Sequence, residues 1–147
     1  MKLHSVIHAV TFLIATLTPC FAHHTALIVN KDNNVDNVTS EHLSKIIRGD
    51  IKQWPNRKGI VLVLHRDAAG EREALERLTK MSASDWNAFV FAHRESILFV
   101  DTDADVIKEV QSEPCAVGLI EVRSIDNSVK VVRVDGKLPM ELGYLPH

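Results

Sequence analysis

A polar turn between two expected elements is the part of the sequence best suited to binding chemistry. It spans residues 66–72, with the sequence RDAAGER, after an apolar run and before a helical pattern. A glycine-containing turn of this kind offers backbone N–H groups at the positive end of a helix dipole, and a guanidinium beside it supplies paired donors. The pattern predicts a site for a small oxyanion, whose candidate ligand-binding residues are Arg66, Ala69, Gly70, Glu71 and Arg72.

Members of this turn also have purely structural explanations. Arg66 could form a surface ion pair with Asp67 or Glu71, and Arg72 could pair with Glu76 one helical turn later. Gly70 suits the turn itself, because glycine tolerates backbone conformations that strain other residues. The sequence leaves both interpretations of the turn open.

Metal binding and catalysis have less support. Residues 23–24 are two histidines that could chelate copper only after cleavage at one bond, and a flexible tail is favoured. The acidic residues within 101–105 resemble the start of a calcium loop but lack its later glycine and bidentate glutamate, so helix capping explains them better. No zinc-ligand spacing relates His42, His65 and His93. We find no nucleophile motif, and we expect a protein that is not an enzyme and uses no metal or cofactor.

The first 22 residues have the pattern of a secretory signal peptide. A basic start is followed by an apolar core over residues 6–17, and Ala22 ends a small-residue cleavage site. The core is shorter than the roughly 20 residues that span a bilayer. We expect residues 1–22 to be removed, and residues 23–147 to form one periplasmic or secreted domain without a membrane span. Lipid attachment at Cys20 is disfavoured because Pro19 is a poor residue at that cleavage point.

The composition of residues 23–147 excludes several classes of function. Without Lys2 the region keeps 16 basic and 19 acidic residues, a net charge of −3. This mild acidity argues against a nucleic-acid partner, which would require a basic face. Cys115 is the one remaining cysteine, so no internal disulfide can form, and its position at the entry to an apolar run favours an inert core thiol.

Apolar runs alternate with helical patterns along this region. Strands are expected over residues 26–30, 60–64, 116–122 and 129–134. Helices are expected from a cap at Thr39 or Ser40 to Gly49, over 71–81, over 84–95, and from Thr102 to Pro114. The alternation predicts a single α/β domain with a mostly parallel sheet flanked by helices. Its expected core includes the aromatic residues Trp54, Trp86 and Phe91.

The order and spacing of these pieces also resemble a known family. The similar segments are residues 27–30, 38–49, 51–54, 60–66, 69–75 and 110–120, together with Trp86 and Phe91. They resemble the phosphate-binding periplasmic components of ABC transporters, in particular small PstS-like members of the type 2 periplasmic binding protein fold. The resemblance implies one half-like unit of that fold, which would bind phosphate or a similar oxyanion and could deliver it to an ABC transporter permease.

The sequence departs from the family pattern at the turn. In the phosphate binders the turn resembles Ser-Gly-Thr followed by Arg, whereas this chain has Ala69, Gly70 and Glu71 before Arg72. Both hydroxyl donors are absent, and Glu71 adds a negative charge where the anion would lie. We also expect the chain to lack the portion that supplies the opposing Thr and Ser contacts. The alternative function is therefore a periplasmic interaction or accessory module, bound to a partner protein, whose phosphate pocket is degenerate.

Overall fold

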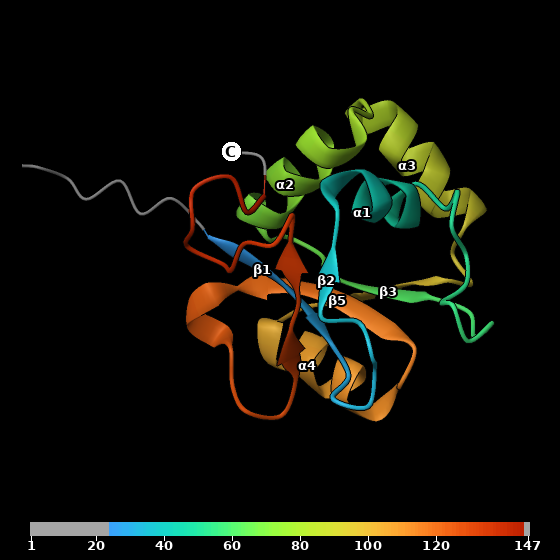
Figure 1. The fold of residues 1–147 in the computed structure, drawn as a ribbon. Coiled ribbons are helices and arrows are strands. Elements are labelled where there is room, and N and C mark those ends of the chain that lie inside the picture. Colours follow the sequence, from blue (N-terminus) through green and yellow to red (C-terminus); the bar gives the residue numbers. More distant parts are fainter. Residues whose placement is uncertain (1–23, 146–147) are drawn as a thin grey trace, which may run out of the picture.

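A five-stranded sheet forms the centre of the molecule in a computed structural model, which describes residues 24–145 (Figure 1). The strands lie in the order β4-β3-β5-β1-β6. Their bounds are Thr25–Val29 for β1, Val61–His65 for β3, Ile97–Val100 for β4, Ala116–Glu121 for β5 and Lys130–Val131 for β6. The predicted α/β domain with helices around a central sheet is confirmed.

The directions of the strands make the sheet mixed. β3 runs parallel to β4 and β5, as expected, whereas β1 runs antiparallel to both β5 and β6. The apolar pattern of residues 26–30 indicated a strand but carried no information on its direction. Whether two paired strands run parallel or antiparallel depends on how the chain connects them, which is decided by the tertiary structure.

Two features of the strands were not predicted. β4 was missed, because its four residues, which follow a helix after a turn over residues 93–96, are too few to show a clear period. The expected strand over 129–134 is divided at Val132, whose N–H bonds to the carbonyl of Leu27. Before this point the chain pairs with β1, and after it β7 (Arg133–Val134) pairs with β2 (Asn37–Val38) in a small parallel sheet.

Helices cover both faces of the sheet (Figure 1). Three of them, α1 (Ser40–Ile47), α2 (Ala69–Thr79) and α3 (Ala83–Ala92), lie on one side, and α4 (Asp103–Ser112) lies on the other. Thr39, one of the two candidate caps, caps α1, and Thr102 caps α4 as predicted; each accepts a backbone N–H on its side-chain oxygen. Gly49, with φ of +73°, follows the end of α1. α2 begins at Ala69, two residues before its expected start.

Each face of the sheet has its own core. The larger core includes Trp54, 6% exposed, and lies beneath α1 and α2. The smaller core lies under α4, where Gly118 of β5 permits close packing: a Cβ at this position would lie 2.7 Å from Cγ1 of Val106. Methylene-sized changes matter at such contacts because protein interiors are close-packed.

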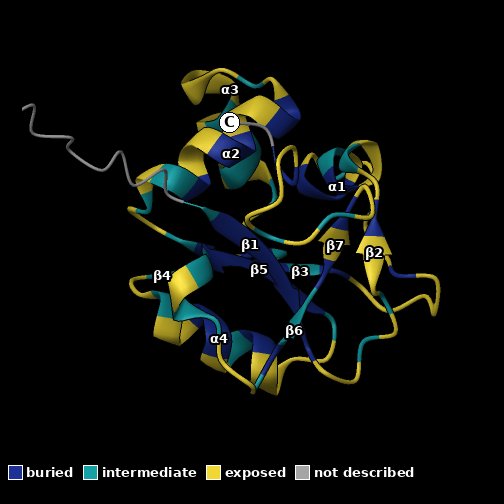
Figure 2. Ribbon diagram, turned by 60° about the vertical axis from the view of Figure 1, so that its left-hand side comes forward, coloured by how far each residue is buried: buried dark blue, intermediate teal, exposed yellow. Residues whose placement is uncertain are grey.

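The prediction that Phe91 belongs to the core is wrong. Its side chain is 74% exposed, and α3 has no buried residue at all, as Figure 2 shows by the exposed colour along that helix. Trp86, Phe89 and Val90 pack against the core from one side of α3, at the spacing of a single helical face. Phe91 follows Val90 by about 100° of helical rotation and therefore points away.

The described helices include none that is long and apolar enough to cross a membrane. The predicted signal peptide over residues 1–22, its cleavage site and His23 lie outside the described residues.

Candidate ligand-binding site

The predicted turn lies where two parallel strands end at the same edge of the sheet. His65 closes β3 and pairs in register with Val100, which closes β4. The chain then turns into the start of α2 on one side and of α4 on the other. The carboxyl edge of the parallel strands is where ligands bind in open α/β sheets, so the sheet topology favours the site that the sequence predicted.

The start of α2 differs from the starts of the other described α-helices. Thr39, Ser82 and Thr102 cap α1, α3 and α4 through their side chains, whereas the N-cap residue of α2 is Ala68, which has no side-chain acceptor. The first N–H groups of a helix have no partner within the helix. At α2 they receive no side-chain cap, and Ala69 and Gly70 lie in this first turn.

Glu71 is turned inward from the same end of α2 and is 4% exposed. Its carboxylate accepts the backbone N–H of His65, at 3.1 Å to Oε1 and 3.3 Å to Oε2. Burial raises the pKa of Glu71 well above its usual value; the N–H of His65 acts in the opposite direction, and the charge of Asp103 adds to the rise. The side chain thus ties the turn to the end of β3.

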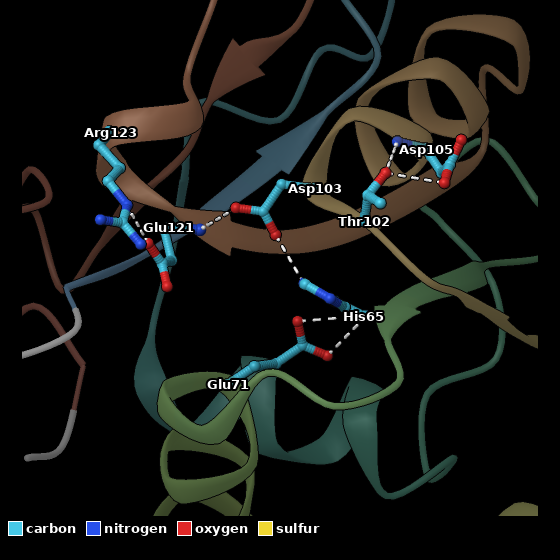
Figure 3. A network of polar contacts seen from close by, with 7 residues as sticks. All are labelled: His65, Glu71, Thr102, Asp103, Asp105, Glu121 and Arg123. Atoms are coloured by element: carbon cyan, nitrogen blue, oxygen red, sulfur yellow. Dashed lines mark hydrogen bonds and ion pairs between the residues drawn. The ribbon is translucent and has the colours of Figure 1, made fainter.

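A second acidic group approaches His65 from the opposite side (Figure 3). Nδ1 of His65 lies 2.9 Å from Oδ1 of Asp103, and Oδ2 of Asp103 accepts the backbone N–H of Glu121 at 3.0 Å. These contacts join β3, α4 and β5 at the sheet edge. Sequence reasoning missed this pair, because it attributed Asp103 to helix capping, and 38 residues separate it from His65.

The two candidate arginines differ in their partners. Arg66 forms an ion pair with Asp101, 3.1 Å from Nη1 to Oδ1, and both side chains are exposed. This pair replaces the Asp67 and Glu71 partners considered from the sequence. Among the described residues Arg72 makes no ion pair, so the pairing with Glu76 considered from the sequence is absent there.

A cavity of about 530 Å³ opens beside the turn. Arg66, Glu71 and Arg72 line it, as does His65, while Ala69 and Gly70 lie next to it in the first turn of α2. Away from the turn the cavity runs between α2 and α3, where Glu76, Thr79 and Asn87 line it together with a larger apolar set: Leu75, Met81, Trp86, Val90 and Phe99. Within residues 24–145 no group of three or more His, Cys, Asp or Glu side chains could hold a metal ion.

Comparison with known proteins identifies related folds. A family model described as the PBP superfamily domain matches residues 15–141. Among solved structures, an ABC-type phosphate transport receptor from Vibrio cholerae is 26% identical with a TM-score of 0.65, and covers 79% of this chain and 48% of its own. A protein assigned as a phosphate ABC transporter substrate-binding protein from Clostridium perfringens, with bound phosphate, is 27% identical with a TM-score of 0.64; the match covers 77% of this chain and 45% of the other.

A third similar structure, PstS from Borrelia burgdorferi, is 19% identical with a TM-score of 0.63, covering 79% of this chain and 49% of its own, and supports the fold alone. This chain therefore spans about half the length of the structures that it matches.

Proposed function

Because this chain belongs to the PBP superfamily, we propose that it is an extracytoplasmic solute-binding protein for phosphate or a similar small oxyanion. The anion would lie at the start of α2, between the backbone N–H groups of Ala69 and Gly70 and the guanidinium groups of Arg66 and Arg72. The observation that carries the proposal is the uncapped start of α2 at the carboxyl edge of the sheet. Two similar proteins, each more than 25% identical, are described as a phosphate transport receptor and a substrate-binding protein.

The charges around the turn support Arg72 as the stronger anchor. It lines the cavity and has no ion-pair partner among the described residues, so its charge is available to a ligand. Arg66 would contact the anion while remaining paired with Asp101, or would exchange that partner for it. An exposed ion pair of this kind contributes at most about 1 kcal/mol, so an exchange costs little.

The role that follows is one of binding and delivery, without catalysis. A solute-binding protein passes its ligand to a transporter, so we propose that this protein acts outside the cytoplasmic membrane and delivers its ligand to the permease of an ABC transporter. The predicted signal peptide over residues 1–22 supports this location.

Calorimetric titration with phosphate and with sulfate tests the proposal. We expect measurable binding of phosphate, and Arg72→Ala should weaken it at least tenfold, because a hydrogen bond to a charged group contributes roughly 1.5–3 kcal/mol. Arg66→Ala should weaken it too. Arg77→Ala is the matched control, since Arg77 lies on the same helix and pairs with Glu73 away from the turn. Absence of heat at millimolar anion would instead favour an accessory module with a degenerate pocket.

A further inference from the structure

The cavity beside α2 is much larger than an inorganic oxyanion. Its volume of about 530 Å³ lies within the roughly 300–1,000 Å³ typical of pockets for drug-sized ligands. A water molecule takes a share of about 30 Å³ of liquid volume, and phosphate has only five heavy atoms. A phosphate ion at the turn would therefore leave most of the cavity to water.

Part of the space that remains is lined by apolar side chains. Its apolar lining comes from Leu75 on α2, Trp86 and Val90 on α3, and Phe99 on β4, while Glu76, Thr79 and Asn87 add polar groups. Ordered water is retained where two to four polar partners surround it, and the part of the wall formed by Leu75, Trp86, Val90 and Phe99 offers none. Trp86 and Phe99 both line this part of the cavity, and aromatic rings pack well against a flat apolar group.

The helix on the far side of the cavity is incompletely packed. α3 has no buried residue, although Trp86 and Val90 face the rest of the molecule, where both are only partly covered. A group that filled the cavity would bury these two side chains further. Burial of apolar surface contributes about 25 cal/mol per Å², so such a group would both bind and hold α3 in place.

We infer that the ligand is an organic phosphate or phosphonate, which places its oxyanion at the start of α2 and a flat apolar substituent between Trp86 and Phe99. The inference rests on the proposed function, whose anion site forms the polar end of the cavity. Arg66, Arg72 and the first turn of α2 would orient the head group. Glu71 is already engaged by the N–H of His65, and Glu76 is exposed, where solvent screens its charge.

Two phosphonates that share the head group and differ in the substituent test this inference. We expect phenylphosphonate to bind on the order of tenfold or more tightly than methylphosphonate in calorimetric titration, because only the phenyl ring fills the apolar space. Equal affinities would overturn the inference and leave the proposed oxyanion function intact. Failure of phosphate and both phosphonates to bind would overturn both.

Substitutions within α3 test whether the phenyl ring of phenylphosphonate binds beside Trp86. Trp86→Ala should abolish the advantage of phenylphosphonate and leave the affinity for methylphosphonate unchanged. Phe91→Ala is the matched control, since it removes an aromatic ring from the same helix at a position that is 74% exposed. If Trp86→Ala fails to fold, Val90→Trp provides the same test, because the larger side chain would fill the cavity and exclude the phenyl ring alone. A preference that survives in the folded variant would place the ring elsewhere and contradict the inference.

Discussion

Glu71 and His65 show how single residues shape the candidate site. The carboxyl group of Glu71 is buried against the backbone N–H of His65, and the imidazole of His65 contacts Asp103. Burying an ionised carboxylate is unfavourable unless it is well paired, and the charge of Asp103 makes it more so. Glu71 therefore holds the turn against the end of β3. The free-energy cost of burying its carboxyl group depends on whether that group is protonated.

Glu71→Gln should change how stability depends on pH. The folded-state pKa of Glu71 is raised above its ordinary value of 4.5, so the folded protein holds this proton more tightly than the unfolded chain. The resulting stabilisation is complete below about pH 4.5 and is lost as pH rises through the folded-state pKa. The Gln variant keeps an acceptor for the N–H of His65 but has no proton to lose at this position. Its free energy of unfolding relative to wild type should therefore increase with pH over that range.

Urea unfolding of both proteins between pH 4 and 8 measures this difference. Glu76→Gln is the control, because it makes the same side-chain change at an exposed position on the same helix. Parallel pH profiles for wild type and Glu71→Gln would contradict the explanation.

At the scale of elements, the start of α2 combines a structural weakness with the proposed binding function. Side-chain caps typically stabilise a helix by about 1 kcal/mol, and α2 lacks one where α1, α3 and α4 have theirs. The N–H groups that a cap would occupy remain available beside the cavity. An anion bound there would take the place of the missing cap.

Ala68→Ser should therefore separate stability from binding. The new hydroxyl can accept an N–H of the first turn of α2, which should raise the free energy of unfolding by about 1 kcal/mol and reduce phosphate affinity by competing for that donor. Chemical denaturation and calorimetry on the same samples measure the two effects. Thr39→Ala, which removes the cap of α1 far from the turn, should lower stability and leave affinity unchanged. A stabilised Ala68→Ser protein with unaltered affinity would mean that these N–H groups do not contact the anion.

At the scale of the whole molecule, the last described segment is hydrogen-bonded to β1 and to Val132 through Tyr144. Tyr144 is 3% exposed; its hydroxyl accepts the N–H of Leu27 at 3.0 Å and donates to the carbonyl of Val132 at 2.6 Å. Burial raises the pKa of Tyr144 to about 12, so the hydroxyl keeps its proton at physiological pH. The contact joins the chain at its two described ends, 117 residues apart.

Tyr144→Phe should lower the free energy of unfolding by about 1–3 kcal/mol, because it leaves a buried N–H and a buried carbonyl without their partner. Thermal and urea unfolding measure the loss. Leu142→Ser lies in the same segment at 91% exposure and should have little effect. Equal stability of Tyr144→Phe and wild type would show that the hydrogen bonds of Tyr144 do not stabilise the fold.

Short-range chemistry in the sequence was enough to predict the α/β class, the cap at Thr102, the end of α1 at Gly49 and a turn that begins at residue 66. It left the cap of α1 open between Thr39 and Ser40, and it extended the turn over residues 69–72, which belong to α2. These features depend on side chains and backbone groups within a few residues of one another. The sequence also indicated which residues of the turn could bind an anion, and that assignment stays a prediction.

Tertiary structure alone decided the direction of β1, the exposure of Phe91, the partner of Arg66 and the meeting of His65 with Asp103. Each depends on which strands pair and which helix face meets the sheet. Such contacts join residues far apart in the chain, and their energies are determined by packing and burial rather than by local propensity. The cavity between α2 and α3 was likewise decided by the tertiary structure, because its lining residues come from several separate elements.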